Sequence, residues 1–382
     1  MSSAIPDQVP PTCSDAAVEA VGRRLPTDRE ATLRRVDELR RRRPRLSDDR
    51  ITLAHGAGGK ASAALIDAVF LDAFGQPDPA ELLDAAVIDL PGGRLAFSTD
   101  SFVVSPLRFP GGSLGDLAVN GTVNDLAVSG ARPRWLSAAF ILEEGLPIDE
   151  LRGLVDDMRR AAQTAGVAIV TGDTKVVPKG AADACFITTS GLGLVPGERR
   201  LGAARVAVGD KLVCSGPIAG HGIAVMIARH RLALDAAIAS DTAPLNGLVE
   251  ALYEAVEPGQ VRWLRDATRG GLGTVANELA QASGLGLWLA DDDIPVDETV
   301  RAACDMLGID PLHVANEGCF VAALAADGAD AGVVALRRAG AAEATVIGQV
   351  VADPPGLVVV ENALGGSRLV DRLVGDALPR IC

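Results

Sequence analysis

The sequence predicts a protein of two successive domains, each built from alternating β-strands and α-helices. The chain has 382 residues, which exceeds the ~100–200 residues of an ordinary domain. Hydrophobic residues make up 48% of it, a share that excludes a chain disordered throughout. Short apolar runs alternate with stretches whose apolar positions recur at helical spacing, so both kinds of element are expected in each half.

The first domain is expected to span residues 51–200. Leu151, Leu154 and Met158 recur at the spacing of a helix, whereas the apolar run at 135–142 is typical of a strand. Strands are predicted at 94–98, 135–142, 167–170 and 185–189, and helices at 114–129 and 151–162.

The second domain is expected to span residues 201–362, after a boundary near 196–208. Its apolar runs are again short and are separated by helical patterns. Strands are predicted at 211–214, 261–265, 285–289, 318–324, 344–351 and 356–360, and helices at 223–229, 298–307 and 331–339.

Two flanking segments differ from these domains. Residues 1–50 form an N-terminal extension that we expect to be partly disordered. Its arginine-rich run at 40–45 favours a solvated helix over a nucleic-acid arm, because acidic residues are interleaved with the arginines. Residues 363–382 are expected to form a mobile tail, with freedom of movement at Gly365-Gly366.

Composition limits the classes of partner. The formal net charge of -14 argues against nucleic-acid binding, which relies on clustered Lys and Arg. ATP stays possible, because acidic residues can hold a nucleotide through Mg²⁺. The six cysteines are scattered, and the sequence contains neither a signal core nor an apolar run of ~20 residues. We therefore expect a reduced cytoplasmic protein without a membrane segment.

Glycines and carboxylates mark the candidate site of the first domain. His55-Gly56-Ala57-Gly58-Gly59-Lys60 resembles a phosphate loop, but Ala54 and Ala61 stand where a Walker loop needs glycine and a hydroxyl. The segment is therefore either a phosphate lid or a plain turn. Three carboxylates lie at the edges of apolar elements and could together supply oxygen ligands to Mg²⁺. They are Asp100, Asp125 and Asp173.

Asp125 lies within an apolar helical pattern, where an unpaired carboxylate would be costly. A metal would compensate it, although a position on the wet face of the helix is the alternative. In the second domain, Asp266 to Gly273 joins a strand to a helix and so places backbone N–H groups at a helix N-terminus that favours anions. Glu317 precedes an apolar strand and could face a cleft as a general base.

Cys382 is the last residue of the sequence. Nothing after it would hold a core side chain in place, so the position suits a group that has to move.

These segments together resemble the HypE family of hydrogenase maturation proteins. That family is the carbamoyl dehydratase branch of the superfamily that contains aminoimidazole ribonucleotide synthetase, selenophosphate synthetase and thiamine monophosphate kinase. The resemblance covers about residues 51–382 and implies an α+β fold with mixed or antiparallel sheets packed by helices and a flexible C-terminal tail. The motifs that carry it are HGAGGK, STDSFVVSPLRFPGG, GTVNDLAVSGARP, FILEEGLP, VTGDTKVVPKG, RDATRGGLGTVANELA, ANEG and the terminal PRIC.

The resemblance implies a reaction on Cys382. A carbamoyl group is loaded onto the terminal thiol by the carbamoyltransferase HypF and is dehydrated with ATP to a thiocyanate. The cyanide passes to iron on the HypC–HypD complex for [NiFe]-hydrogenase. Members are homodimers that join through their N-terminal domains.

The resemblance also assigns residues to roles. Besides Cys382, it implies Glu317 as the base and Lys175 for phosphate binding or orientation. Those expected to bind ATP are Lys60, Asn124, Asp125, Asp173, Thr174 and Lys175, and those expected to bind Mg²⁺ are Asp100, Asp125 and Asp173. A further anion or tail site would comprise Asp266, Thr268, Arg269, Gly270 and Gly271.

Two other functions are weighed against this one. Selenophosphate synthetase needs a reactive Cys or selenocysteine in the first Gly-rich loop, and residues 56–62 contain none. A non-catalytic thiol carrier would have no need of ligands for Mg-ATP. Gly220 departs from the family pattern, which commonly has an acidic residue there, and leaves the role of the His221-Gly222 junction open.

Overall fold

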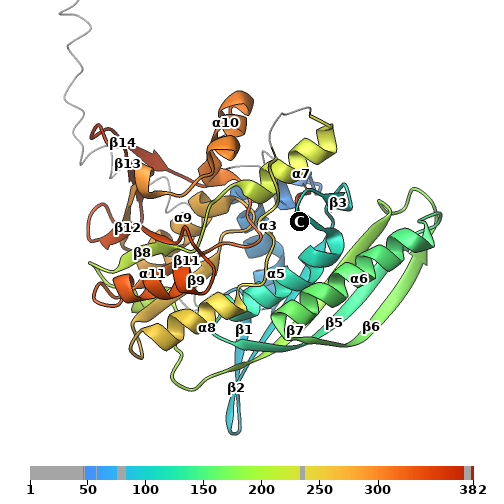
Figure 1. Ribbon diagram of the computed structural model, residues 1–382, viewed down its shortest axis with the longest axis horizontal. Helices are drawn as coiled ribbons and strands as arrows, with labels where there is room; N and C mark the ends of the chain where they lie inside the picture. The colour runs from blue at the N-terminus through green and yellow to red at the C-terminus, as the bar shows by residue number, and fades with distance from the viewer. Residues whose placement is uncertain (1–45, 47, 57, 75–82, 233–236, 374–379) are drawn as a thin grey trace, which may run out of the picture. The chain divides into compact units, whose positions relative to one another are not determined.

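Two β-sheets organise the part of the chain that the structure describes (Figure 1). The computed structural model describes residues 46, 48–56, 58–74, 83–232, 237–373 and 380–382. Most of the expected extension 1–50 and residues 374–379 of the expected tail therefore lie outside the described residues.

The first sheet has five strands in the order β1-β2-β7-β5-β6, of which only β5 and β6 run parallel. Helices α5 and α6 pack on one face of it, which we call the covered face (Figure 1). The elements are β1 (Ala86–Leu90), β2 (Gly93–Phe102), β5 (Arg132–Glu143), β6 (Ala168–Val177), β7 (Cys185–Val195), α5 (Leu114–Val128) and α6 (Ile148–Ala165).

Local sequence explains both helices. The Ser113 hydroxyl caps α5 by accepting hydrogen bonds from the N–H groups of Gly115 and Asp116. Helix α6 ends at Gly166, which adopts the left-handed conformation that glycine tolerates best. The helices cover one side of the sheet, and its opposite face, here called the open face, leaves five large apolar side chains 42–47% exposed. These are Ile88, Phe97, Trp135, Ile141 and Leu194.

The second sheet has seven strands in the order β14-β13-β10-β12-β8-β11-β9 and is covered on both faces. Helix α9 packs on one face, whereas α8 and α11 pack on the other. Every residue of β11, an internal strand between β8 and β9, is therefore buried. The elements are β8 (Lys211–Cys214), β9 (Val261–Asp266), β10 (Gly286–Ala290), β11 (Phe320–Leu324), β12 (Thr345–Val351), β13 (Val358–Glu361), β14 (Ser367–Val370), α8 (Asn246–Ala255), α9 (Gly271–Ser283) and α11 (Ala329–Arg338).

The remaining elements connect and flank the sheets. Helix α7 begins after a residue in the left-handed conformation, Ala219, and leads from the second sheet toward the first. These elements are 3₁₀-helix η1 (Leu53–Gly56), α3 (Lys60–Leu65), π-helix η2 (Ile66–Leu71), α4 (Asp72–Phe74), β3 (Arg108–Phe109), β4 (Gly112–Ser113), 3₁₀-helix η4 (Ala203–Arg205), α7 (Gly220–His230), η5 (Asp291–Asp293), α10 (Glu298–Leu307) and η6 (Pro311–His313).

The expected mixed fold of helices and mixed or antiparallel sheets is confirmed. Each predicted strand and helix lies on an observed one, whereas β1, α8 and β14 were not expected. Gly365-Gly366 does not form the expected hinge but the turn of the β13–β14 hairpin, with Gly366 O accepting from Asn362 N–H at 2.9 Å. The second sheet therefore continues to Val370, beyond the expected domain end at residue 362.

The described helices include none that is long and apolar enough to cross a membrane.

Candidate functional site

Four aspartates from different parts of the chain form a carboxylate cluster between the two sheets. Asp84 precedes β1, Asp100 lies on β2, Asp125 on α5, and Asp266 ends β9. One carboxylate oxygen from each of Asp84, Asp125 and Asp266 lies within 4.8 Å of the other two. Asp100 lies near this group, since its charge raises the pKa of Asp125.

The cluster concentrates negative charge where solvent is scarce. Burial raises the pKa of Asp84 to about 7 and raises the pKa of Asp125 and Asp266 well above the ordinary value. Neighbouring carboxylates raise these pKa values further. Arg265 offsets part of this charge, because its Nη1 donates to Asp84 Oδ1 at 2.7 Å.

The donor set fits a divalent cation. Buried Oδ2 atoms of Asp84 and Asp266 find no hydrogen-bond partner within the described chain. Such buried acceptors are costly when they are unsatisfied. A hard cation such as Mg²⁺ prefers carboxylate oxygens and would satisfy them. The cluster can therefore hold Mg²⁺ through Asp84, Asp125 and Asp266, with Asp100 beside them.

Short local features hold the cluster together. Ser98 Oγ donates to Asp125 Oδ2 at 2.6 Å and so joins β2 to α5. The turn after Asp266 requires glycine at two positions, because Gly270 and Gly271 have φ angles of +76° and +59°. A Cβ at Gly271 would also lie 2.5 Å from the backbone oxygen of Val314. This turn lets α9 begin directly beside the carboxylates.

The last three residues, Arg380 to Cys382, lie next to β2, and we call them the tail segment. Each of their backbone carbonyls accepts a hydrogen bond. Arg229 donates to Arg380 O, His221 donates to Ile381 O at 2.9 Å, and Val103 N–H donates to Cys382 O at 3.1 Å. Val103 lies three residues after Asp100, so the tail brings Cys382 close to the strand that carries part of the cluster.

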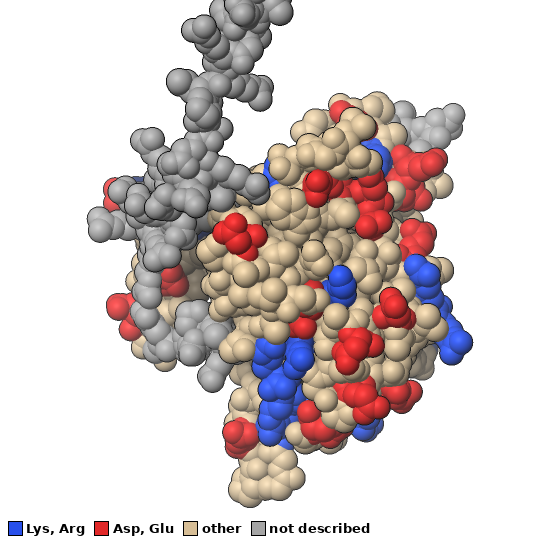
Figure 2. Space-filling model, turned by 90° about the vertical axis from the view of Figure 1, so that its left-hand side faces the viewer, with Lys and Arg blue, Asp and Glu red and all other residues tan. Residues whose placement is uncertain are grey.

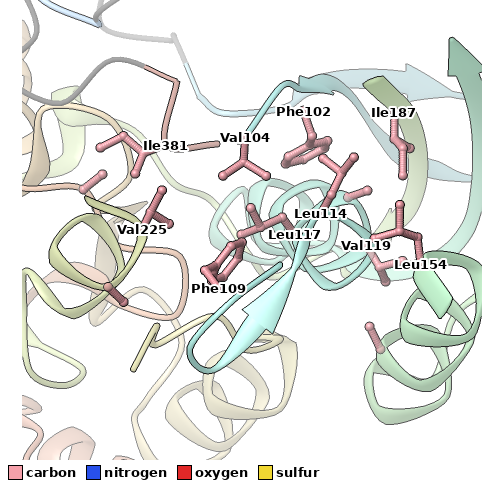
Figure 3. Packing of buried hydrophobic residues seen from close by; sticks show 14 of the residues in the cluster. Phe102, Val104, Phe109, Leu114, Leu117, Val119, Leu154, Ile187, Val225 and Ile381 are labelled. Carbon is pink, nitrogen blue, oxygen red and sulfur yellow. The ribbon is translucent and has the colours of Figure 1, made fainter. Parts of the chain in front are cut away.

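The side chain of Ile381 anchors the tail segment in the hydrophobic core. It is only 4% exposed and belongs to the cluster of buried residues between α5 and α7. Figure 3 shows it beside Val225 and Val104. Full burial of such a side chain contributes about 1.5–3 kcal/mol. Cys382 itself is partly exposed.

The imidazole ring of His221 is neutral and hydrogen-bonds to the backbone of the tail segment. Burial lowers the pKa of His221 to about 4, so the ring carries one proton at neutral pH. Because Ile381 O can only accept, Nε2 must carry that proton. Nδ1 then accepts from Ser240 Oγ at 2.7 Å. The junction whose role the sequence left open is thus a contact for the tail segment.

Cys382 lies at a cavity of about 340 Å³. The cavity is lined by residues of both expected domains, 51–200 and 201–362, and by the tail segment. Arg269 reaches it from the turn before α9, and its Nη1 donates to Gly56 O at 3.0 Å. Lining residues include His55, Gly56, Val103, Arg269, Ile381 and Cys382. Residues of the predicted glycine-rich loop and of the predicted anion site therefore line the same cavity as Cys382.

Glu317 is buried close to this site. Burial raises the pKa of its carboxyl well above the ordinary value, and neighbouring carboxylates raise it further, whereas the charge of Arg269 lowers it. These carboxylates belong to Asp266, Asp241 and Asp100. The structure thus places the predicted base among the carboxylate cluster and Arg269.

Asp173, Thr174 and Lys175 do not join the site within this chain. They lie exposed on β6, and Lys175 Nζ forms an ion pair with Asp173 Oδ2 at 2.7 Å. Strand β6 is three positions from β2 in the sheet, which is roughly 14 Å at about 4.8 Å per strand. This placement corrects the expectation that Asp173 lies with Asp100 and Asp125.

Sheet register also separates these residues by face. The row that contains Asp173 continues through Ala139 and Thr188 to Ser101, the neighbour of Asp100. Successive strand residues point to opposite faces. Asp173 and Lys175 therefore lie on the open face, whereas Asp100 lies on the covered face.

Two further predicted ATP ligands have other partners. The Asn124 amide donates to Glu317 O at 3.2 Å and to Ala243 O at 3.1 Å, and it accepts from Leu245 N–H. Its hydrogen-bonding capacity is therefore used by backbone. Lys60 Nζ pairs with Asp371 Oδ2 at 2.7 Å, and both side chains are largely accessible.

Sequence reasoning missed three residues of the site. Asp84 carries the same signal as Asp100, a carboxylate at the edge of an apolar strand, and could have been found in that way. No sequence signal linked His221 to the tail, 160 residues away. Asp241 lies between α7 and α8 without any motif around it.

Comparison with known proteins bears on this arrangement. Family models described as AIR synthase related protein match at residues 83–195 for the N-terminal domain and 207–361 for the C-terminal domain. A carbamoyl dehydratase HypE of Rhodobacter capsulatus is 50% identical over 341 residues, which cover 88% of this chain and 99% of that protein. The chain belongs to the HypE family.

Solved HypE structures share the fold. A HypE chain from a crystal structure of a HypE–HypF complex has a TM-score of 0.77 and 44% identity, and the match covers 81% of this chain and 100% of that one. A HypE structure in complex with ATP has a TM-score of 0.72 and 46% identity, and the match covers 87% and 100%. The resemblance seen in the sequence is confirmed, and HypE relatives are named as enzymes.

Proposed function

We propose that this chain dehydrates an S-carbamoyl group on its own Cys382, with ATP, to a thiocyanate that supplies cyanide for [NiFe]-hydrogenase maturation. One observation carries the proposal: the tail segment binds beside β2, with Cys382 O held by Val103 N–H at 3.1 Å. Val103 directly follows β2, the strand that carries Asp100 of a cluster suited to Mg²⁺. The name carbamoyl dehydratase among relatives and a HypE structure with ATP support it.

Asp84, Asp100, Asp125 and Asp266 would hold Mg²⁺ and, through it, ATP. The ion would draw charge from the transferring phosphoryl group, which is the main catalytic requirement of phosphoryl transfer. The chain itself supplies position, because the tail contacts fix Cys382 before reaction. Arg269 adds a positive charge at the cavity that receives the carbamoyl group.

The reaction balances with the groups present. The carbamoyl oxygen attacks the γ-phosphorus of ATP, a C–O–P linkage forms, the bond to ADP breaks, and one N–H proton is released. The C–O bond then breaks, phosphate departs with the bonding electrons, and removal of the second N–H proton completes S–C≡N. Glu317 is the proposed acceptor of that proton, because a raised pKa makes its carboxylate a stronger base.

A homodimer would bring Lys175 into use. The open face exposes Trp135 and Ile141, and β6 is an edge strand that is exposed along its length. Unpaired edges and apolar sheet faces favour association with another chain. A second copy of this chain would cover this face, and Lys175 would then bind phosphate or orient the substrate at the dimer interface.

The proposed partners follow from the reaction. HypF would load the carbamoyl group, and a HypE–HypF complex is among the similar structures. HypC–HypD would accept the cyanide. Nucleic acid is not proposed, since the net charge is -14 and Figure 2 shows acidic side chains spread among basic ones on the described part of one face. A cytoplasmic setting would keep the thiol of Cys382 reduced.

Mass spectrometry of the C-terminal peptide tests the proposal. After carbamoylation by HypF, we expect the peptide to lose the mass of one water only when ATP and Mg²⁺ are present. Cys382→Ser serves as the matched control and should remain unmodified. A carbamoylated peptide that keeps its mass in the presence of Mg-ATP would show that the chain is a thiol carrier.

A further inference from the structure

Asp241 is a partly buried aspartate outside the carboxylate cluster. It lies in the segment between α7 and α8, and all its partners are backbone groups. Its Oδ1 accepts from Glu317 N–H and its Oδ2 accepts from Gly318 N–H, each at 3.1 Å. The N–H groups of His221 and of Asp241 itself also hydrogen-bond to this carboxylate. A carboxylate has about four acceptor positions, so these donors fill it.

The contact with Gly318 leaves no room for a side chain. A Cβ at this position would lie 1.8 Å from the backbone oxygen of Asp241. The two segments can therefore approach as they do only because residue 318 is glycine. On the other side, Asn124 Nδ2 donates to Glu317 O at 3.2 Å. The backbone of Glu317 is thus held at both its N–H and its carbonyl.

The residues that hold the backbone of Glu317 also connect it to the carboxylate cluster. Asn124 precedes Asp125 on α5. The same helix therefore carries a carboxylate of the cluster and the amide that donates to the backbone carbonyl of Glu317. Asp241 accepts a hydrogen bond from the backbone N–H of Glu317. The Glu317 side chain lies near charged groups from three other segments. Those groups are Asp100 on β2, Asp266 on β9 and Arg269 in the turn before α9.

We propose that Asp241 is a positioning residue that fixes the backbone of Glu317 so that its carboxylate meets the departing N–H proton. The inference rests on the proposed function, in which Glu317 is the base. It requires a carboxylate, because an amide at position 241 would turn an N–H group toward one of the two donors. A displacement of about 1 Å in a catalytic group can lower the rate by about 100-fold.

A double-mutant cycle separates this role from a merely structural one. The variants are Asp241→Asn, Glu317→Gln and the pair. Asp210→Asn is the control, since Asp210 also accepts a backbone N–H, from Ala207 at 2.8 Å, and is itself buried. Single-turnover conversion of carbamoylated Cys382 gives the rate, and ATP dependence gives KM.

We expect Asp241→Asn to lower kcat by roughly 10–100-fold with KM for ATP unchanged within about twofold. In the Glu317→Gln background it should lower the rate by less than about threefold, because the group it positions is already gone. Asp210→Asn should leave kcat unchanged. Asp241→Ser, which keeps one oxygen acceptor and removes the second, should also lower kcat and serves as the test if Asp241→Asn does not fold.

Equal losses from Asp241→Asn in both backgrounds would overturn the positioning role and leave the proposed function intact. So would an Asp241→Asn variant with the rate of the parent when Glu317→Gln is inactive. A fully active Glu317→Gln would overturn the assignment of the base, and with it this inference, whatever Asp241→Asn does.

Discussion

The two faces of the first sheet carry different parts of the proposed site. On the covered face, Asp100 meets Asp125 of α5 in a buried cluster with raised pKa values. On the open face, Asp173 and Lys175 pair with each other in solvent, and the hydrogen bond from Lys175 lowers the pKa of Asp173. Residues that look equivalent as motifs thus have opposite environments, because strand residues alternate between faces.

This difference suggests separate roles for the two faces, with cation binding on the covered face of one chain and dimer contact on the open face. The covered face, together with Asp266 from the second sheet, offers oxygen ligands for a cation within a single chain, including buried acceptors on Asp84 and Asp266 without partners in its described part. The open face has exposed apolar side chains and a basic group, which suits contact with a second copy. The comparison predicts that substitutions on the covered face lower ATP turnover, whereas substitutions on the open face weaken dimerisation.

The largest effect is expected on the covered face. Asp125→Asn should lower ATP turnover by roughly 10²–10³-fold, because it removes a cation ligand at the charge-stabilising centre. The melting temperature should not fall, since the neutral side chain relieves repulsion within the cluster. Steady-state ATP hydrolysis and circular dichroism measure the two quantities.

Asp116→Asn is the matched control for that substitution. Asp116 lies on the same helix but accepts from Ser113 at the helix start, outside the cluster. Its replacement should leave turnover within about twofold. Undiminished turnover in Asp125→Asn would show that the cluster does not hold the catalytic ion.

A smaller effect is expected on the open face. Trp135→Asp should raise the dimer Kd by roughly 100-fold, because it places a charge at the centre of an apolar interface. Sedimentation equilibrium measures this change. Met306→Asp is the control, since Met306 is 74% exposed on α10 and away from the open face. A parent protein that is monomeric at all concentrations would refute the dimer.

How far the sequence predicted this molecule depends on the range of the interaction. Elements with local signals were found, such as α10, whose predicted bounds 298–307 match Glu298–Leu307. Motif residues were also found, but their faces were not. Asp173 was grouped with Asp100 because both end apolar runs, and only the strand register separates them.

Contacts between distant segments were beyond the sequence. His221 binds Ile381 O across 160 residues, and Asp241 binds the N–H of Glu317 across 76. Both depend on backbone groups, which leave no trace in side-chain patterns. Gly365-Gly366 shows the opposite case, where a local pattern was seen but a hairpin turn was taken for a hinge.

The smallest effect concerns pH and the covered face. Because burial raises the pKa of Asp84 to about 7, the folded cation-free protein binds more protons than the unfolded chain between its ordinary pKa of 3.8 and about 7. Its stability should therefore fall as pH rises through this window. Mg²⁺ needs the ionised carboxylates, so it should stabilise the protein more at pH 8 than at pH 6.

We expect the Mg²⁺-induced rise in Tm to be larger at pH 8 by at least about 2 °C, the shift that roughly 1 kcal/mol produces. Differential scanning calorimetry without nucleotide measures it, and Asp125→Asn should show a much smaller rise at both pH values. An equal rise at pH 6 and pH 8 in the parent protein would mean that Mg²⁺ binds away from the buried aspartates.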